Sequence, residues 1–296
     1  MIQDIVKQSK LLDPKSKLII FGGGYSGQRI ASAARNLGAK VLCSRREKNS
    51  EGADFVFNSN KELTKEILIG ATHVISCIPP LANGKDPLLS QIKNQLINLK
   101  DLEWIGYLST TGVYGDKKGN WVNEDTKPNP QQERSIRRLS CEQEWLETNL
   151  PVQILRLPGI YGPGRSAVDN LINGKSQMID KPGQVFSRIH VDDIAGAILF
   201  LINLYTLGNQ PKIINLSDNL PTTNLEVITY AAKLLKRSPP KIIPFDIAEQ
   251  TMSPMAQSFW QENRRVDNNL LCKKLGYSLI YPDFKSGLEN CYSRYK

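Results

Sequence analysis

Three glycines with a regular spacing carry the clearest chemical signal in this chain. Gly22, Gly24 and Gly27 follow the apolar run 18–21 and precede a helical pattern. A strand that turns into a helix in this way presents backbone N–H groups and the positive end of a helix dipole to phosphate groups. The glycines allow, in order, the tight turn, the close approach of a pyrophosphate and close packing of the helix on the strand. We therefore expect a dinucleotide here. The contacts expected at this loop are Gly22, Gly24, Tyr25, Ser26 and Gly27.

The end of the second expected strand, 40–44, indicates which dinucleotide is bound. In a site for NAD, an Asp or Glu about 20 residues past the first glycine binds the ribose 2′-hydroxyl. This chain places Ser44, Arg45 and Arg46 there, and Glu47 is the first acid. Guanidinium groups bind a 2′-phosphate through charge-assisted hydrogen bonds. We predict NADP in preference to NAD; the alternative is that the two arginines are solvated in a surface loop.

The composition limits the other classes of partner. The 296 residues carry a net charge of +9, but the basic residues are spread along the chain without an aromatic-rich basic patch, so no nucleic acid is expected. No run approaches the roughly 18 apolar residues of a membrane span, and the first 16 residues are too charged for a signal peptide. Two histidines and five cysteines without metal-ligand spacing predict no metal site. We expect a cytoplasmic monomer or homodimer that takes a small-molecule substrate.

Apolar runs alternate with helical patterns along the chain. Besides the helix after the glycines, the expected strands are 18–21, 40–44, 55–57, 73–78, 102–108, 152–157 and 212–216, and the expected helices 61–69, 88–99, 141–150, 191–204 and 225–235. Strands separated by helices of this length form a parallel sheet. The prediction is an α/β fold, a Rossmann-type doubly wound parallel sheet with a smaller C-terminal substrate lobe. Ile78 and Pro79, where a proline ends the strand 73–78, are included among the cofactor contacts.

The same pattern predicts how the chain divides. Residues 1–16 are a polar leader that forms one or two helical turns. Residues 17–165 form the NADP-binding Rossmann domain. Residues 166–296 are mostly the substrate lobe, from which a segment at about 188–220 returns to the Rossmann domain, because its helix and strand continue the alternation.

Further motifs support a family resemblance. They are Leu108 to Gly115 (LSTTGVYG), Arg156 to Pro163 (RLPGIYGP), Arg188 to Asp193 (RIHVDD), Asn215 to Asp218 (NLSD) and Leu275 to Tyr277 (LGY). Together with the glycine loop, they make roughly residues 17–290 resemble the extended short-chain dehydrogenase/reductase superfamily, in particular NAD-dependent epimerase/dehydratases such as nucleoside-diphosphate-sugar epimerases. The resemblance implies a Rossmann domain, a small substrate domain and a nicotinamide dinucleotide.

The catalytic positions of that family are only partly filled. The family uses a Ser or Thr, which corresponds to Thr110, and a Tyr-x-x-x-Lys pair on one face of the following helix. Arg134 and Arg138 stand at the tyrosine and lysine positions, and an arginine is no proton-transfer base near neutral pH. Two guanidiniums four residues apart are suited to hold an anion, or they pair with acidic neighbours on the surface. Thr110 either takes part in catalysis or is only a polar residue at the end of a strand. Tyr114, four residues before Lys118, is the nearest replacement base.

Three more residues are candidates for the substrate cleft. Tyr161 and Arg165 lie in the Gly-Ile-Tyr-Gly loop, where they line the cleft or only stabilise the loop. In related UDP-sugar epimerases an arginine three residues before Ile-His-Val binds the substrate diphosphate. Here that position is Phe186, and Arg188 is the nearest arginine. We predict an NADP-dependent oxidoreductase or epimerase-like enzyme with a non-standard active site, acting on a small sugar-like substrate. The alternative is a non-catalytic NADP-binding sensor or interaction protein.

Overall fold

Two compact units make up the protein in the computed structural model, which describes residues 2–10, 12–47, 52–58, 63–205, 208 and 210–296. Unit 1 comprises the chain up to Thr110 together with Glu133–Arg156 and Val191–Ile214. Unit 2 comprises Thr111–Gln132, Leu157–His190 and Asn215–Lys296. Residues 111–132 and 157–165 therefore belong to unit 2, whereas the sequence analysis grouped them with the Rossmann domain.

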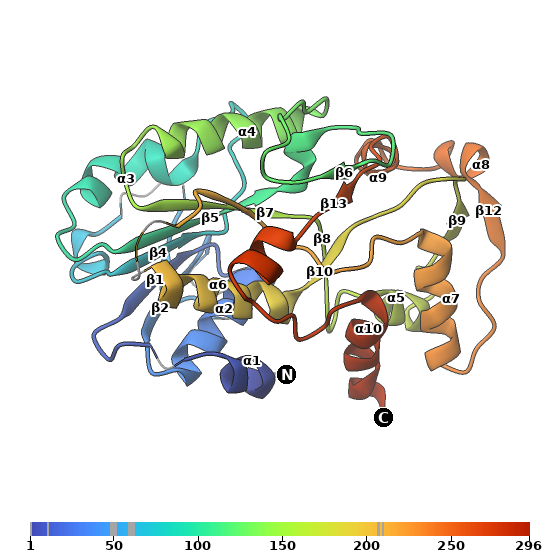
Figure 1. Ribbon diagram of the computed structural model, residues 1–296, viewed down its shortest axis with the longest axis horizontal. Helices are drawn as coiled ribbons and strands as arrows, with labels where there is room; N and C mark the ends of the chain where they lie inside the picture. The colour runs from blue at the N-terminus through green and yellow to red at the C-terminus, as the bar shows by residue number, and fades with distance from the viewer. Residues whose placement is uncertain (1, 11, 48–51, 59–62, 206–207, 209) are drawn as a thin grey trace. The chain divides into compact units, whose positions relative to one another are not determined.

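A seven-stranded sheet forms the centre of unit 1 (Figure 1). Its strands are β1 (Lys17–Phe21), β2 (Lys40–Arg45), β3 (Phe55–Val56), β4 (His73–Ser76), β5 (Trp104–Thr110), β7 (Val152–Leu157) and β11 (Ile213–Asn215). They follow the order β11-β7-β5-β4-β1-β2-β3, and β1 runs parallel to both β2 and β4. The strand order reverses direction beside β1, as a doubly wound Rossmann-type sheet requires. The predicted α/β fold class is confirmed.

Helices cover both faces of this sheet (Figure 1). They are α1 (Ile2–Gln8), α2 (Tyr25–Asn36), α3 (Pro87–Ile97), α4 (Glu133–Leu146) and α6 (Val191–Tyr205), with the 3-10 turn η1 (Lys65–Ile67). Helices α1, α2 and α6 pack together on one face, and α3 and α4 lie on the other. The leader contains α1, whose Ile5 is fully buried. Of the helix expected at 61–69 the structure shows η1; positions 61 and 62 lie outside the described residues.

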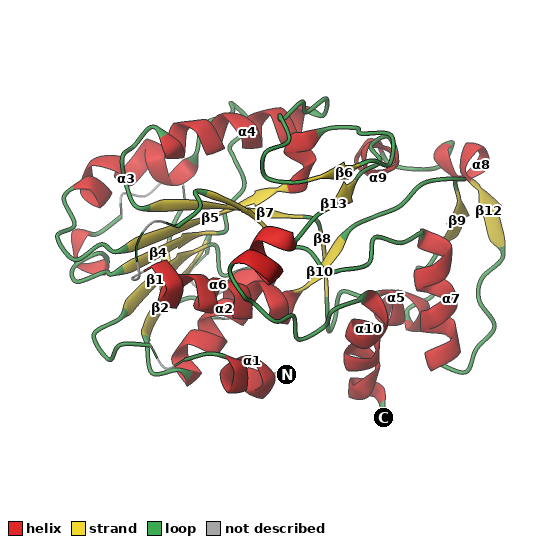
Figure 2. Ribbon diagram, in the orientation of Figure 1, coloured by secondary structure: helices red, strands yellow, loops and turns green. Residues whose placement is uncertain are grey.

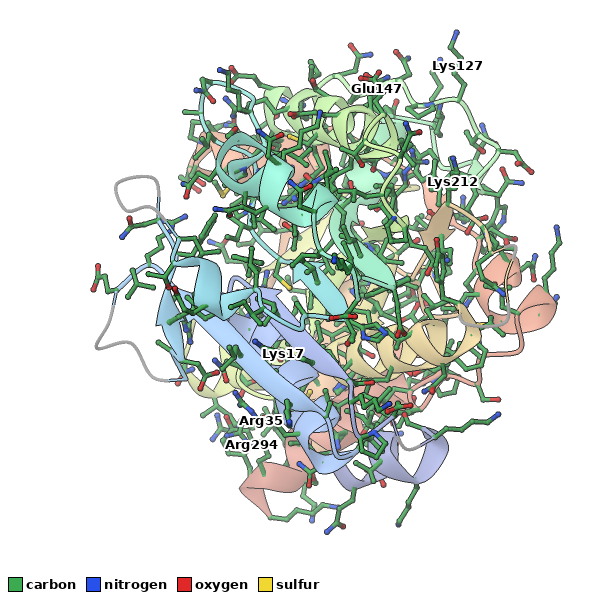
Figure 3. The ribbon with its side chains drawn as sticks, turned by 90° about the vertical axis from the view of Figure 1, so that its left-hand side faces the viewer. Lys17, Arg35, Lys127, Glu147, Lys212 and Arg294 are labelled. Carbon is green, nitrogen blue, oxygen red and sulfur yellow. The ribbon has the colours of Figure 1, made fainter. Side chains whose placement is uncertain are left out.

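The strands of unit 1 are buried because both faces of a parallel sheet are covered. Phe21 and Tyr107 contribute to one core with Leu88 of α3 and Trp145 of α4, and all four side chains are buried. Lys17, labelled in Figure 3, begins β1 at the amino edge of the sheet. The loops that follow β1, β2 and β4 therefore meet at the opposite, carboxyl edge, where ligands bind in sheets of this type.

Unit 2 contains short strands and helices (Figure 2). Its elements are η2 (Thr111–Tyr114), β6 (Trp121–Val122), β8 (Gly159–Tyr161), α5 (Ala167–Ile172), β9 (Met178–Asp180), β10 (Arg188–His190), α7 (Asn224–Leu234), β12 (Ile242–Pro244), α8 (Phe245–Glu249), α9 (Pro254–Trp260), β13 (Arg265–Val266), the π-helical turn η3 (Leu270–Lys274), α10 (Phe284–Tyr292) and η4 (Ser293–Tyr295). Three parallel strand pairs, β8 with β10, β9 with β12 and β6 with β13, form its sheets. The expected Gly-Ile-Tyr-Gly loop thus contains the strand β8. Within the described residues, no helix combines the length and apolarity of a membrane span.

Candidate functional site

The glycine loop between β1 and α2 is fixed to the end of β2 by one residue. Gly22 has a φ of +94°, a left-handed conformation that favours glycine. The backbone N–H of Gly22 donates to Ser44 Oγ at 3.0 Å, and that of Gly23 donates to the Ser44 carbonyl oxygen at 2.6 Å. Because Ser44 is 1% exposed, it holds the loop from inside. Ser44 therefore serves the predicted site as the anchor of its glycine turn.

The second and third glycines differ in what surrounds them. A Cβ atom at Gly27 would overlap the carbonyl oxygen of Gly22, so only glycine lets α2 approach β1 this closely. A Cβ atom at Gly24 would meet nothing within 4 Å. Gly24 is also the N-cap of α2 and provides no side-chain cap. The first N–H groups of α2 therefore face a space that a phosphate group can enter.

A pocket of about 750 Å³ opens beside this loop. We call it the glycine-loop pocket; its walls are Gly22, Gly23, Gly24, Ser44, Arg45, Arg46, Glu47, Phe57, Asn58, Cys77, Ile78, Pro79, Pro80, Leu81, Ala82, Pro87 and Gln91. Seven residues of the predicted cofactor set are among them: Gly22, Gly24, Ser44, Arg45, Arg46, Ile78 and Pro79. Tyr25, Ser26 and Gly27 form the first turn of α2. Arg45 is half-buried, and Arg46 is exposed.

Sequence reasoning identified Ile78 and Pro79 but missed the other wall residues that follow β3 and β4. Phe57 and Asn58 come directly after β3, and Cys77 to Ala82 come after β4. The signal that identifies them is positional, since loops after neighbouring parallel strands share one edge of the sheet. Gln91 of α3 completes the wall: its Nε2 donates to the Asn58 carbonyl at 3.1 Å. Its Oε1 is buried and has no hydrogen-bond partner in the described part of the chain.

Helix α4 holds the wall formed by the loop after β4. Arg138 Nη1 donates to the Ile78 carbonyl at 3.2 Å, and Arg137 Nη1 donates to the Ala82 carbonyl at 3.0 Å. One turn further along, Cys141 Sγ lies 3.3 Å from the carbonyl oxygen of Gly84. The side chains at 137, 138 and 141 thus bind three carbonyl groups spread along this loop.

Arg138 also connects β4 to β5. Its Nη1 donates to the Leu108 carbonyl at 3.0 Å and to the Tyr107 hydroxyl at 3.1 Å. The Tyr107 phenol thus lies beside a cation, and it resembles in this respect the Tyr–Lys pair of short-chain dehydrogenases, in which the tyrosine accepts a proton from the substrate. It is fully buried, however, and burial raises its pKa well above the usual value. Burial thus disfavours the phenolate form of Tyr107, the form that accepts a proton from a substrate.

The two residues predicted to act in catalysis have different environments. Thr110 is the last residue of β5 and is half-buried. Tyr114 ends η2 in unit 2 and is fully buried, and its hydroxyl donates to Asn215 Oδ1 at 2.8 Å. Lys118 lies beyond η2 and is exposed, so Tyr114 and Lys118 do not share a helical face.

The remaining candidates for the substrate cleft divide between the units. Arg134, like Arg138, is half-buried on α4 in unit 1. Tyr161, Arg165 and Arg188 belong to unit 2 and do not line the glycine-loop pocket. The Tyr161 hydroxyl donates to the carbonyl of Asp283 at 3.3 Å, and Tyr161 is buried in a core with α5, α7 and α10.

Arg165 and Arg188 differ in exposure. Arg165 is exposed after β8. Arg188 is half-buried, and its Nη1 donates to the carbonyls of Phe186 at 2.8 Å and Thr222 at 3.1 Å. Part of the hydrogen-bonding capacity of Arg188 is therefore used within unit 2.

Comparison with known proteins gives the family. A structure described as a functionally unknown conserved protein from Silicibacter pomeroyi DSS is 35% identical, with a TM-score of 0.84, over 95% of this chain and 99% of that one. The Escherichia coli protein YeeZ is 27% identical over 90% of this chain and 97% of its own length. The family model for the NAD dependent epimerase/dehydratase family matches residues 82–217. The chain belongs to the NAD-dependent epimerase/dehydratase family.

Solved structures of lower identity share the fold. The human epimerase family protein SDR39U1, solved with NADPH, is 15% identical with a TM-score of 0.71, over 94% of this chain and 99% of that one. Other solved structures at similar identity are complexes with NAD. Solved structures of this fold thus contain either NADPH or NAD.

Proposed function

We propose that unit 1 binds NADP(H) in the glycine-loop pocket. The observation that carries this proposal is the open cradle at Gly24, at the N-terminus of a helix without a side-chain cap. A pyrophosphate there would accept hydrogen bonds from the first N–H groups of α2. Gln91 Oε1, a buried acceptor in the pocket wall whose surroundings offer it no donor among the described residues, would accept a hydrogen bond from an amino group such as that of adenine.

The end of β2 supports NADP in preference to NAD. Arg45 and Arg46 line the pocket next to Ser44, where the adenosine ribose lies in folds of this type. Their guanidinium groups offer paired, charge-assisted hydrogen bonds to a 2′-phosphate. The first acid, Glu47, also lines the pocket but is exposed. An NAD site would instead need its carboxylate on the ribose 2′-hydroxyl.

For the reaction, we propose an oxidoreductase or epimerase-like enzyme with a non-standard site and a small sugar-like substrate. A bound nicotinamide supplies hydride transfer. Thr110, at the carboxyl end of β5, offers a hydroxyl group to a substrate at this edge of the sheet. The guanidinium group of Arg138 is suited to stabilise negative charge. The protein therefore differs from the epimerases that rely on a Tyr–Lys pair.

A second candidate function is non-catalytic NADP(H) binding, as in a sensor. The observation in its favour is that the phenol beside Arg138, that of Tyr107, is fully buried with a raised pKa. Hydride transfer from NADPH to a panel of sugars, aldehydes and ketones distinguishes the two candidates. Turnover with any member supports the enzyme, and binding without turnover across the panel supports the sensor.

Titration of the unmodified protein with NADPH and NADH tests the cofactor. We expect tighter binding of NADPH, because only NADPH carries the 2′-phosphate. The double variant Arg45→Ala/Arg46→Ala should bind NADPH about 10- to 100-fold more weakly for each charge-assisted hydrogen bond to the 2′-phosphate that it removes, with unchanged NADH affinity.

The double variant Lys93→Ala/Lys100→Ala is the matched control, since it removes the same charge from two exposed positions outside the pocket. It should bind both nucleotides as the unmodified protein does. Equal affinities of the unmodified protein for NADPH and NADH would contradict the assignment.

A further inference from the structure

Arg138 is anchored by one nitrogen and leaves its other nitrogens available. Nη1 donates to the carbonyls of Ile78 and Leu108 and to the hydroxyl of Tyr107. Nε and Nη2 make no hydrogen bond with any described residue, and they are not among the fully buried atoms without a partner, so each keeps some exposed surface. The side chain is thus held in place while one edge of its guanidinium group stays accessible.

The charge of Arg138 is not balanced locally. Its three acceptors are neutral, and no carboxylate among the described residues forms an ion pair with it. Arg137, the other arginine that anchors this wall, does form an ion pair: its Nη1 lies 3.4 Å from Glu133 Oε1. A half-buried cation loses part of its hydration, and a nearby anion normally offsets that cost. Arg138 is therefore an unbalanced positive charge at the carboxyl edge of the sheet.

The Nε–Nη2 side of the Arg138 guanidinium group can bind a carboxylate with two parallel hydrogen bonds, as Arg156 of this protein does. Arg156 donates from Nε to Glu142 Oε1 at 3.1 Å and from Nη2 to Glu142 Oε2 at 2.7 Å. These are the same two nitrogens that Arg138 leaves available. Two parallel N–H groups in a plane match the two oxygens of a carboxylate.

The position of Arg138 relates it to the reacting end of the cofactor. The glycine loop follows β1, and Arg45 ends β2, so a dinucleotide with its 2′-phosphate at Arg45 runs from β2 across β1 towards β4 and β5. Neighbouring strands are about 4.8 Å apart, so β2 and β5 are about 14 Å apart across the sheet. Arg138 binds the carbonyls of Ile78, just after β4, and of Leu108, near the end of β5. It does not line the glycine-loop pocket itself, but it lies behind the pocket wall at Ile78, on the side of the sheet opposite Arg45.

We propose that Arg138 is the receptor for a carboxylate group of the substrate. Its Nε and Nη2 bind the two carboxylate oxygens, while Nη1 stays fixed to the strand ends. The proposal rests on NADP(H) binding in the glycine-loop pocket, and it names the class of substrate: a small carboxylate-bearing compound, such as a sugar acid or an oxo acid.

Calorimetric titration of the full-length protein saturated with NADP⁺ tests this proposal, with oxalate, malonate and inorganic phosphate as probes. We expect saturable binding of a carboxylate probe to the unmodified protein. Arg138→Gln should weaken it about 10- to 100-fold, the effect of removing a charge-assisted bidentate interaction. Arg138→Lys, which keeps the charge without the planar fork, should give an intermediate affinity. Arg35→Gln is the control, because Arg35 pairs with Asp54 outside the pocket.

The outcomes separate this inference from the proposed function. Failure of the unmodified protein to bind NADP⁺ overturns the proposed function. Intact NADP⁺ binding without carboxylate binding, or with carboxylate affinity unchanged in Arg138→Gln, overturns only the inference. Binding of phosphate but not of the carboxylates at Arg138 also overturns it, as does loss of NADP⁺ affinity in both Arg138 variants. Thermal melting shows which variants are folded, and Arg138→Lys provides the test if Arg138→Gln does not fold.

Discussion

Gly27 of α2 lies against the carbonyl oxygen of Gly22, so closely that a Cβ atom on Gly27 would overlap it. Gly24, between them, faces open space. We therefore expect Gly27→Val to lower stability, because it forces backbone apart in a packed region at a cost of about 1–3 kcal/mol. Gly24→Val should keep the melting temperature and abolish NADP(H) binding, because its side chain fills the space of the pyrophosphate.

Thermal melting and nucleotide titration of both variants check this prediction, and each variant is the control for the other. Gly24 itself is extended at the N-cap, with a negative φ of −73°, so a valine there does not need the left-handed conformation that favours glycine. Unchanged NADPH affinity in Gly24→Val would mean that the dinucleotide does not lie along this loop.

The sheet was predictable from the sequence because its strands are buried on both faces and form continuous apolar runs. Strand β7 has the predicted bounds 152–157, and β1 begins one residue before the predicted 18–21. The pairing of Gly22 and Gly23 with Ser44 was not predictable, although Ser44 was expected at the site, because this contact depends on the register of β1 against β2.

The wall of the pocket was predictable only in part for the same reason. Ile78 and Pro79 were identified at the proline that follows the strand. The anchoring of that loop by Arg137 and Arg138 joins positions more than 50 residues apart, and no local pattern encodes it. Strand β8 was missed because it pairs in parallel with the distant β10 inside a segment rich in glycine and proline.

The ion pair between Glu142 and Arg156 gives a second prediction. Both side chains are almost fully buried, and Ser109 Oγ also donates to the Glu142 carboxylate. Glu142→Gln should lower the free energy of unfolding by about 3–5 kcal/mol, because the buried charge of Arg156 then loses the carboxylate with which it pairs. The double variant Glu142→Leu/Arg156→Met should cost much less than the single variant, since it removes both charges.

Unfolding in urea measures both values on the same scale. Retention of NADPH affinity in the folded fraction of each variant shows that the effect is on stability. A cost below about 1 kcal/mol for Glu142→Gln would show that water reaches Arg156 and that the pair behaves as a surface ion pair.

His73 gives a prediction about pH. It is 2% exposed, and burial lowers its pKa to about 4, whereas in the unfolded chain its pKa is about 6.5. Below pH 6.5 the unfolded state therefore binds more protons than the folded state, and stability falls as the pH decreases towards 4. Between pH 7.5 and pH 5 this group alone should remove about 2 kcal/mol of stability.

The variant His73→Gln, which does not titrate, isolates this contribution. Urea unfolding at pH 7.5 and pH 5 measures the loss of stability between these values. This loss should be about 2 kcal/mol smaller in His73→Gln than in the unmodified protein. Equal losses in both proteins would mean that His73 is protonated in the folded state as readily as in the unfolded chain.

The last prediction concerns turnover. Arg138 occupies the lysine position of the family pair, and a phenolate base typically raises the rate of such a reaction 10²- to 10⁴-fold. Interconversion of UDP-glucose and UDP-galactose should therefore be slower than about 1 s⁻¹.

The remaining candidate base is Tyr114, whose hydroxyl is fully buried and donates to Asn215. Tyr114→Phe should therefore cost about 1 kcal/mol of stability and leave the turnover of any substrate nearly unchanged. Thr110→Val, by contrast, removes a half-buried hydroxyl at the carboxyl edge of the sheet and should reduce that turnover with little effect on NADPH affinity. A 10²-fold loss of turnover in Tyr114→Phe would identify Tyr114 as the base. Fast epimerisation by the unmodified protein would show that Arg134 and Arg138 do not stand at the positions of the family's catalytic Tyr and Lys.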